Sequence, residues 1–365
     1  MLRSVSPALM CALGHNPSAV KASVFRGPHD IRVEDVPDPA IRDAGDAIVR
    51  VRRATVCGSD LWFYRGYWDW KPGYRTGHEF LGVVSEVGPA VETLQPGDPV
   101  LSPFTYSDGT CEFCSTGLPT SCIRGGTFGG ARDDGGQGEL VRVPLADGTL
   151  LRLPEEVANE PARLDGAALL ADVVPTGHHA AVAAGVKPGS SAVVIVDGAV
   201  GLCAVIAARR RGAARIIAAG HHPDRLEIAR TFGATDLFDL SHNGGGEHLR
   251  ELTDGGAPHV LEAVGTQASM DLAMAAVRPG GRIGFVGVPS AVDGLRMDQM
   301  FAHNITVAGG MAPARTYQPE LLRAFAAREF DPTPVITMRV PLDGVPDGYA
   351  AMDQRRAIKV LVDVT

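Results

Sequence analysis

The sequence contains no apolar run that approaches the ~20 residues a membrane-spanning helix needs. Lysine and arginine form no long cluster; the densest basic stretch is Arg209–Arg211, and the formal net charge is −8. We therefore expect neither a nucleic-acid partner nor attachment to a membrane. Internal repeats and low-complexity segments are also lacking. The apolar share of 45% and the charged share of 21% are typical of a soluble globular protein.

Cysteine is scarce, and its spacing is informative. The six cysteines are Cys11, Cys57, Cys111, Cys114, Cys122 and Cys203. Three of them fall within a turn-rich stretch of twelve residues. Because the chain shows no convincing export signal, this spacing favours metal binding over disulfides and predicts a cytoplasmic protein. Residues 1–19 hold only a short, interrupted apolar run, and we expect them to form a disordered leader.

The chain divides into two halves with different patterns, as its length of 365 residues suggests. From residue 22 to about 153, short β-branched runs alternate with Gly, Pro and Asp, which predicts an all-β barrel with few helices. After Pro175, apolar strands alternate with helices, which predicts a doubly wound parallel sheet. The last strand, expected over 358–362, indicates that the chain returns to the first half after Val307.

A thiol, an imidazole and a carboxylate are candidates for one metal site. They are Cys57 in Cys-Gly-Ser-Asp, His78 in Gly-His-Glu, and Asp172 in Asp-Val-Val-Pro-Thr-Gly. Three ligands of mixed softness are typical of a catalytic zinc, which keeps a fourth position open, whereas a structural zinc takes four protein ligands. Alone, Cys57 or His78 is better explained as an ordinary buried residue. Their occurrence together with Asp172 and the extra carboxylate of Glu79 favours zinc.

A degenerate glycine motif lies between the apolar strand 193–196 and the helix expected over 200–211. It reads Val196-Asp-Gly198-Ala-Val200-Gly201, with Val where a dinucleotide fingerprint has its first Gly. Gly198 would let the backbone approach a pyrophosphate, and Gly201 would allow tight packing of helix against strand. The N-terminus of the helix would supply N–H donors. A βα turn without a ligand is the alternative.

The end of the second strand of this half, 215–219, bears on the choice of cofactor. NAD enzymes place a carboxylate there, and NADP enzymes need room and cations. Gly220 leaves room, while His222 and Arg225 could approach a 2′-phosphate, and Asp224 argues the other way. The sequence therefore favours NADP over NAD.

These ordered motifs, from about Val20 to the C-terminus, resemble those of the zinc-dependent medium-chain dehydrogenase/reductase family of the alcohol dehydrogenase type. The resemblance implies a GroES-like β-barrel catalytic domain with an inserted Rossmann domain. We expect the catalytic domain over 20–172, with a zinc lobe at 105–125, the Rossmann domain over 173–308, and a return to the catalytic domain over 309–365.

The resemblance also implies roles for individual residues. Cys57, His78 and Asp172 match the ligands of the catalytic zinc, and Glu79 matches an acid that can approach the metal during ligand exchange. Ser59 matches a hydroxyl that relays the alcohol proton. Asp60 matches an acid that orients the site and is expected to pair with Lys359. The residues expected near the nicotinamide cofactor are Thr176, Gly198, Val200, Gly201, Gly220, His222, Arg225 and Lys359.

The sequence departs from the family pattern at three places. Val196 in the fingerprint is one. Trp62 stands where the next member of the proton relay is often His, so a proton leaving Ser59 would need the cofactor ribose or water. In the lobe, the ligand series reads Asp108, Cys111, Cys114, Cys122, with Asp in place of the first Cys. A zinc held by one carboxylate and three thiolates is favoured, and a metal-free lobe is the alternative.

The expected reaction is reversible hydride transfer between an alcohol and NADP(H). Rival hypotheses are a reductase of a C=C or C=N bond on the same fold, and a non-catalytic nucleotide-binding protein. The substrate is expected to be a small alcohol or carbonyl compound. Six aromatic residues between 62 and 70 could bind a bulky apolar or aromatic alcohol or stack on a sugar ring, or they could simply pack under a loop. By resemblance, we expect a dimer or tetramer that assembles through edge strands near 282–288.

Overall fold

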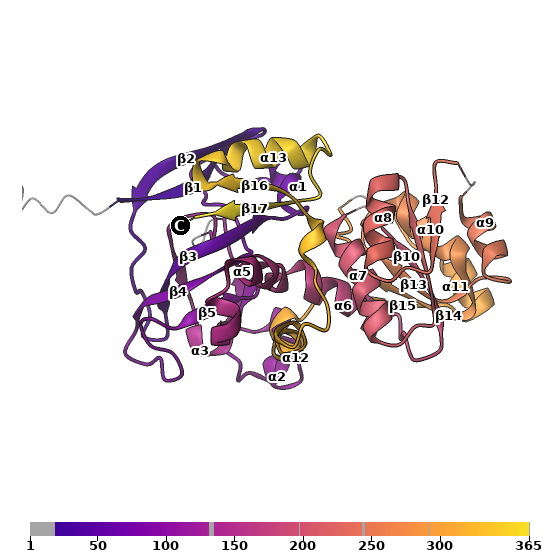
Figure 1. The fold of residues 1–365 in the computed structure, drawn as a ribbon, viewed down its shortest axis with the longest axis horizontal. Coiled ribbons are helices and arrows are strands. Elements are labelled where there is room, and N and C mark those ends of the chain that lie inside the picture. The colour runs from indigo at the N-terminus through magenta and orange to yellow at the C-terminus, as the bar shows by residue number, and fades with distance from the viewer. Residues whose placement is uncertain (1–18, 131–134, 197, 243–244, 291, 365) are drawn as a thin grey trace, which may run out of the picture.

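The computed structural model describes residues 19–130, 135–196, 198–242, 245–290 and 292–364. The leader expected over 1–19 therefore lies outside the described residues, except for Ala19, which begins the first strand instead of belonging to a leader. Figure 1 shows two bodies, one dominated by strands and one in which helices flank a parallel sheet.

The first body contains a seven-stranded sheet in the order β16-β17-β3-β4-β5-β9, with β8 paired to β3. The strands are β3 (Ala47–Val56), β4 (Phe80–Val87), β5 (Pro99–Ser102), β8 (Leu140–Val143), β9 (Leu151–Arg152), β16 (Ile336–Pro341) and β17 (Lys359–Asp363). Two short ladders stand beside it: β1 (Ala19–Gly27) with β2 (Asp30–Pro37), and β6 (Thr105–Tyr106) with β7 (Gly126–Thr127). The β-rich character is thus confirmed.

Closure of this sheet into a barrel is not confirmed. Within the described ranges the main pairing path has two ends, β16 and β9, and these two strands do not pair with each other. The reason is local: β9 has only two residues, and they pair with β5 alone. The sheet is therefore an open, strongly curved layer. Short helices lie along it: α1 (Asp60–Tyr64), α2 (Glu112–Ser115), α3 (Ala146–Thr149), α4 (Glu155–Ala158) and α5 (Pro161–Ala168).

The C-terminal segment returns to the first body, as the sequence predicts. The strand β17 pairs antiparallel with β3, with Val360 opposite Val56, and it pairs parallel with β16. In Figure 1 the yellow strands β16 and β17 and the helix α13 (Val345–Asp353) lie among the indigo strands β1 to β3. This pairing places Lys359 next to the end of β3, where Cys57 follows.

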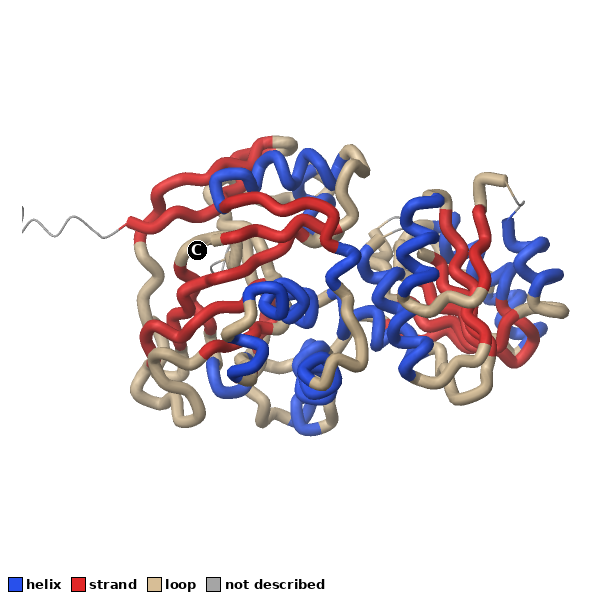
Figure 2. The backbone as a smooth tube through the Cα atoms, in the orientation of Figure 1, coloured by secondary structure: helices blue, strands red, loops and turns tan. Residues whose placement is uncertain are grey.

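The second body holds a six-stranded, all-parallel sheet in the order β12-β11-β10-β13-β14-β15. The strands are β10 (Ser191–Ile195), β11 (Arg215–Gly220), β12 (Asp236–Asp239), β13 (Ala257–Glu262), β14 (Val277–Phe285) and β15 (Thr306–Gly309). The central strands are almost wholly buried because helices cover both faces, which is why they read as continuous apolar runs. Figure 2 shows these helices around the sheet.

The helices of this body and its neighbours complete the fold. They are α6 (Val173–Ala183), α7 (Ala199–Arg210), α8 (Pro223–Thr231), α9 (Gly245–Leu252), α10 (Gln267–Ala276), α11 (Met297–His303) and α12 (Ala314–Ala326). The described residues also include the short 3₁₀ turns η2 (Pro119–Ser121), η3 (Leu169–Ala171), η4 (Thr333–Val335) and η5 (Leu342–Gly344). No helix of the described part is long and apolar enough to cross a membrane.

The sheet order corrects one prediction. The strand β14, which covers most of the stretch 282–288 expected at a sheet edge, is paired on both sides, with β13 and with β15. The edge on that side is β15. The sequence could not show this because β15 is a short strand of four residues, of which none is fully buried.

A shared core joins the two bodies. One apolar cluster runs from Leu81 and Leu101 of the first sheet through η3, α6 and α7 to Ala218 of the second sheet. The helices α6 and α7 approach very closely: a Cβ placed on Gly177 would lie 2.6 Å from the backbone nitrogen of Ala204. Only glycine fits at this crossing. Gly177 therefore fixes how α6, with Asp172 at its N-terminus, packs on α7 of the second body.

Candidate active site

Three elements of the first body and its boundary bring the predicted metal ligands together. Cys57 directly follows β3, His78 lies two residues before β4, and Asp172 occupies the N-cap position between η3 and α6. Cys57 and Asp172 are buried, and the His78 side chain is 17% exposed. The strand ends are fixed by the β3–β4 ladder, and the turn at Asp172 is fixed by the core beneath it.

The distances between these side chains fit a tetrahedral metal. Cys57 Sγ lies 3.4 Å and His78 Nε2 lies 3.5 Å from Asp172 Oδ2. With ordinary zinc–ligand bond lengths, tetrahedral coordination separates such ligand atoms by about 3.4–3.6 Å. One ligand atom from each of Cys57, His78, Glu79 and Asp172 lies within 4.8 Å of the others. The donor set and its spacing therefore suit a zinc ion with three ligands and a fourth acid nearby.

Hydrogen bonds from neighbouring residues orient the three ligands. Asp60 Oδ1 lies 3.2 Å from His78 Nδ1, which leaves His78 Nε2 for a metal. Asp60 Oδ2 also accepts the Cys57 backbone N–H at 3.0 Å. The Thr176 hydroxyl donates to Asp172 Oδ1 at 2.6 Å, so Oδ2 faces the other ligands. The Ser59 hydroxyl lies 3.3 Å from Cys57 Sγ, at the rim of the same site.

The prediction that Asp60 pairs with Lys359 is wrong. The ammonium of Lys359 forms a short ion pair with Glu79 Oε2, which also accepts the hydroxyl of Thr55. Both charged side chains are 1% exposed. The β3–β17 register sets Lys359 beside the end of β3, and Glu79 directly precedes β4 on the other side of β3, whereas Asp60 lies on α1. The other oxygen, Glu79 Oε1, is buried and has no hydrogen-bond partner among the described residues.

The charges of the site shift its protonation equilibria. Burial, and then the negative charges of Glu79 and Asp172, raise the pKa of Cys57 to about 11. Burial alone would lower the pKa of His78, but Asp60, Cys57 and Asp172 outweigh it and hold that pKa well above its usual value. Burial alone would raise the pKa of Asp172, but the hydrogen bond from His78 and the nearby positive charges hold it below its usual value. The free thiol thus keeps its proton at neutral pH, and metal binding would release it.

The lobe brings its four predicted ligands together as well. One ligand atom from each of Asp108, Cys111, Cys114 and Cys122 lies within 4.8 Å of the others. Asp108 Oδ1 accepts the backbone N–H groups of Thr110 and Cys111, each at 2.9 Å. Asp108 Oδ2 lies 3.1 Å from Arg124 Nε. The carboxylate that replaces the first cysteine is therefore already held by the loop, with one oxygen facing an exposed guanidinium.

The thiols of the lobe differ in acidity. Burial, with the hydrogen bonds that its thiol donates to Cys111 and Cys122, raises the pKa of Cys114 to about 12. The backbone N–H of Cys114 instead lowers the pKa of Cys111. One thiol of the lobe therefore ionises more readily than an ordinary cysteine, which suits a cation site, although the geometry also allows a reduced, metal-free lobe.

The glycine turn of the second body has the geometry expected for a phosphate cradle. Gly198 is the N-cap of α7, and a Cβ placed on it would meet no atom within 4 Å. A Cβ on Gly201 would lie 3.0 Å from Val196 Cα, so this glycine allows α7 to pack on the end of β10. Val196 is itself buried, in the place where the fingerprint has Gly. Val200, on the first turn of α7, is half-buried.

The residues expected at a 2′-phosphate lie at the end of β11. Gly220 is the last residue of β11, and His222 is the half-buried N-cap of α8. Arg225 lies on the first turn of α8 and is 8% exposed. Its guanidinium therefore sits mostly inside the second body, and contact with a 2′-phosphate stays a prediction. Asp224 is exposed.

The six aromatic residues between 62 and 70 separate into two groups. Phe63 stacks on Trp70 at 3.8 Å between ring centroids, and Tyr64 packs against Tyr349, so these rings belong to the core of the first body. Trp62 instead meets Tyr67 edge to face at 5.5 Å, and Tyr67 and Trp68 are 69% and 37% exposed. Only Trp62, Tyr67 and Trp68 are thus available as a wall for a substrate.

Two buried residues near the metal ligands escaped the sequence analysis. Phe104 meets the His78 ring edge to face at 6.4 Å and packs against Ala312 and Ala314 on the segment that leads into α12. Tyr349 donates its hydroxyl to Gln137 Oε1 at 3.0 Å. Phe104 lies in a loop, where a single aromatic residue carries no periodic signal, whereas Tyr349 is a buried residue of α13 and reads as ordinary core.

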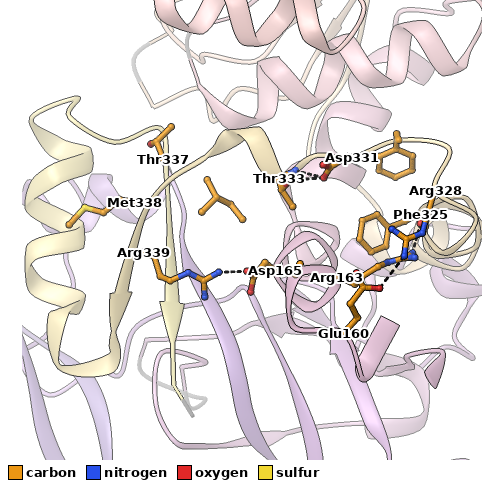
Figure 3. Close-up of a pocket in the computed structure, with 13 residues that line it drawn as sticks. Glu160, Arg163, Asp165, Phe325, Arg328, Asp331, Thr333, Thr337, Met338 and Arg339 are labelled. Atoms are coloured by element: carbon orange, nitrogen blue, oxygen red, sulfur yellow. Dashed lines mark hydrogen bonds and ion pairs between the residues drawn. The ribbon is translucent and has the colours of Figure 1, made fainter. Parts of the chain in front are cut away.

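A cavity of about 670 Å³ in the described structure lies away from these residues (Figure 3). Its walls come from α5, from the segment that follows α12, and from β16, and include Asp165, Phe325 and Arg339. None of the predicted site residues lines it. Two ion pairs line it, Arg339 with Asp165 and Arg328 with Glu160. We therefore place the chemistry at the metal ligands, not in this cavity.

Comparison with known proteins agrees with this site. Residues 43–155 match the alcohol dehydrogenase GroES-like domain, and residues 199–327 match the zinc-binding dehydrogenase family. The zinc-type alcohol dehydrogenase B of Aspergillus flavus is 35% identical over 350 residues, which cover 94% of this chain and 81% of that protein. The structure of the alcohol dehydrogenase TADH from Thermus sp. ATN1 is 35% identical, with a TM-score of 0.86 over 94% of this chain and all of that one.

A further solved structure bears on the cofactor. A candidate zinc-binding dehydrogenase from Sinorhizobium meliloti, solved with NADP bound, is 25% identical with a TM-score of 0.83, and the match covers 95% of this chain and all of that one. Together with the ligand geometry and the parallel sheet, these similarities establish that the chain belongs to the zinc-dependent medium-chain dehydrogenase family and is an oxidoreductase of the alcohol dehydrogenase type.

Proposed function

We propose that the protein transfers a hydride between an alcohol and NADP(H), giving an aldehyde or ketone in the forward direction. The observation that carries this proposal is the set of Cys57, His78 and Asp172 side chains at tetrahedral spacing. Both rival hypotheses are weakened by the same observation, because neither a zinc-free reductase nor a non-catalytic protein needs these ligands assembled.

Each residue of the site has a proposed task. Cys57, His78 and Asp172 hold the zinc, which when bound polarises the substrate oxygen and lowers the pKa of the alcohol. Asp60 keeps His78 in the tautomer that leaves Nε2 for the metal. Ser59 Oγ, 3.3 Å from Cys57 Sγ, accepts the proton of the substrate hydroxyl. Since position 62 carries an indole with no acceptor, the proton leaves Ser59 for solvent or the cofactor ribose.

Glu79 has a different task. Its Oε2 is engaged by Lys359 and Thr55, while Oε1 is buried and faces no partner among the described residues. We propose that Oε1 approaches the metal when ligands exchange. The ion pair with Lys359 holds Glu79 Oε2 in place until then. We also propose that Lys359 contacts the cofactor.

For the dinucleotide, the proposed site is the turn from β10 to α7. The open space at Gly198 and the tight packing at Gly201 support a pyrophosphate over the N-terminus of α7, beside Val200. Thr176 would lie at the nicotinamide. NADP is proposed over NAD because β11 ends in Gly220 and not in a carboxylate, because the half-buried His222 follows it, and because the relative from Sinorhizobium meliloti was solved with NADP.

A second zinc is proposed in the lobe, held by Asp108, Cys111, Cys114 and Cys122. Metal analysis of the purified protein tests it directly. Two zinc ions per chain, falling to one in the variant Cys114→Ser, support the lobe site. One zinc per chain in the parent refutes it.

A homo-oligomer is proposed through the exposed edge of the second sheet. The edge strand β15 offers unpaired backbone groups, and the neighbouring helix α11 exposes Phe301 and Met297 to 90% and 65%. Light scattering after size exclusion should give a dimer or tetramer that Phe301→Glu weakens. The free thiols of the described chain support the cytoplasm as the proposed compartment. The proposed domain boundaries lie between residues 172 and 173 and between residues 308 and 309.

The decisive experiment is a panel of alcohols and carbonyl compounds followed by nicotinamide absorbance, in parallel with NADP⁺ and NAD⁺. Alcohol turnover that disappears in Cys57→Ser and after chelation, and that is faster with NADP⁺, supports the proposal. Equal turnover by Cys57→Ser and the parent contradicts it. Aromatic and aliphatic alcohols in the same panel test whether Trp62, Tyr67 and Trp68 form a substrate wall.

A further inference from the structure

The topology of the second sheet identifies where a dinucleotide lies. From β10 the chain proceeds to β11 on one side, and β13 continues to β14 on the other side. In open parallel sheets, ligands bind outside the carboxyl ends of the strands at such a switch point. The two walls of this crevice are the turn after β10, with Gly198, and the turn after β13, which begins at Ala263.

The last residue of β13 is Glu262, directly beside Ile195 of β10. Its side chain is fully buried. Glu262 Oε1 accepts the backbone N–H groups of Val264 at 2.8 Å and Gly265 at 2.7 Å. Burying a carboxylate costs free energy unless hydrogen bonds compensate it. These two bonds come from the turn after β13, so the carboxylate fixes the backbone of that turn.

The same oxygen is linked to the next helix. The Ser269 hydroxyl donates to Glu262 Oε1 at 2.8 Å, and it also accepts the backbone N–H of Thr266 at 3.1 Å. Thr266 and Ser269 form the capping box at the start of α10. Glu262 therefore ties three consecutive parts together: the strand end, the turn 263–265 and the first turn of α10.

The turn is confined from its other side as well. Gly265 has φ of +83°, and a Cβ on it would lie 2.3 Å from the Val288 carbonyl oxygen. A Cβ on Gly287 would lie 2.1 Å from Gly265 N. The turns after β13 and β14 thus touch backbone to backbone. The hydrogen bonds to Glu262 on one side and the backbone contact with the turn after β14 on the other therefore fix the position of the turn 263–265.

We propose that Glu262 is a positioning residue for the nicotinamide half of the dinucleotide. The adenosine half is expected at the end of β11, on the opposite side of β10, and the pyrophosphate at Gly198. The nicotinamide half must then lie on the β13 side of the crevice, which is the side that the turn 263–265 borders. Glu262 acts through the backbone of this turn and does not touch the cofactor. The inference rests on the proposed dinucleotide site.

The test compares whole dinucleotides with fragments that contain only the adenosine half. Calorimetric titration with NADPH and with NADH, and separately with 2′,5′-ADP and 5′-AMP, is carried out on the purified holoenzyme without substrate. Glu262→Gln keeps the shape of the side chain but removes its charge from three hydrogen bonds. We expect the Kd of the dinucleotide to rise roughly tenfold, because charge-assisted hydrogen bonds are the stronger ones, while the Kd of the fragment stays within about twofold.

Two further variants complete the design. Ser269→Ala removes one of the three donors and should weaken dinucleotide binding by a smaller factor; it decides the question if Glu262→Gln does not fold. Glu251→Gln makes the same chemical change at an exposed position of α9 and should alter neither affinity. In steady state, Glu262→Gln should raise the KM for the dinucleotide with little change in kcat.

Several outcomes overturn the inference. Unchanged dinucleotide affinity in Glu262→Gln would do so, and so would an equal loss for dinucleotide and fragment, which would indicate general damage to the second body. The inference also fails if the parent protein binds NADPH or NADH no more tightly than it binds the fragments 2′,5′-ADP or 5′-AMP. If the parent binds none of the four ligands, the proposed function fails first, and that result is distinct from the others.

Discussion

The buried ion pair between Lys359 and Glu79 gives the sharpest prediction. Lys359→Met keeps most of the packing volume but removes the positive charge, and it leaves Glu79 in a place where both side chains are 1% exposed. Only the Thr55 hydroxyl would still contact Glu79 Oε2. Removing one partner of a buried pair typically costs about 3–5 kcal/mol, because the remaining charge is uncompensated. We expect a loss of this size in the free energy of unfolding.

The chain allows this loss to be measured in the correct body. All three tryptophans, Trp62, Trp68 and Trp70, belong to the first body, so their fluorescence during urea denaturation reports the unfolding of the part that contains the pair. Zinc content is measured on each sample, so that loss of metal is not mistaken for loss of the pair. The double variant Glu79→Gln with Lys359→Met removes both charges and should recover a large part of the stability.

A matched control separates burial from charge. Lys21→Met breaks the Lys21–Asp343 pair, whose side chains are 49% and 67% exposed. Exposed pairs contribute little, so this variant should unfold almost as the parent does. If Lys359→Met also unfolds at the parental urea concentration with the same zinc content, the claim that Lys359 compensates Glu79 is refuted.

Three further predictions follow from other contacts. Cys57→Ser should lose one zinc per chain by metal analysis and lose alcohol turnover, and retention of both would contradict the ligand assignment. Gly177→Ala should lower the free energy of unfolding by about 1–3 kcal/mol in urea titration, because its Cβ would meet Ala204 N at 2.6 Å; unchanged stability would show that α6 and α7 can separate. Burial lowers the pKa of His178 from 6.5 to about 4, so the unfolded chain binds a proton that the folded chain does not as pH falls through this window. Stability present above pH 6.5 should therefore decline towards pH 4, by on the order of 1–3 kcal/mol. In His178→Phe, whose ring can still pack on Tyr317, this part of the decline should be absent.

The grouping of the proposed metal ligands could be predicted because each lies in a short local motif with its own chemistry. Cys57 and His78 follow and precede strands whose β-branched runs are recognisable, and Asp172 precedes a Thr-Gly pair that only close helix packing requires. The strand and helix limits from β10 to α8 were likewise accessible, since fully buried parallel strands read as apolar runs. The cysteine spacing indicated a metal site in the lobe, and the family resemblance added Asp108 to the expected ligands.

What escaped prediction depends on pairing between distant segments. The edge of the second sheet is β15, a partly exposed strand of four residues whose pattern is too weak to recognise. The open path of the first sheet depends on a two-residue strand, β9. Phe104 reaches His78 only because the loop before the lobe folds back over the ligand. Each of these is set by tertiary packing, and a single sequence carries no local trace of it.

The partner of Lys359 is the most instructive of these failures. Both Asp60 and Glu79 are buried acids that follow a metal ligand closely in sequence, and either could have taken the cation. The antiparallel register of β17 on β3 sets Lys359 beside the end of β3, and its ammonium pairs there with Glu79, which directly precedes β4. This choice matters chemically. Asp60 keeps its full charge for His78 Nδ1 and so favours Nε2 as the metal-binding nitrogen. Glu79, although near the metal, is neutralised by Lys359 and does not become a permanent fourth ligand that would close the site. In the proposed zinc site, the last strand of the chain would thereby leave one coordination position for substrate.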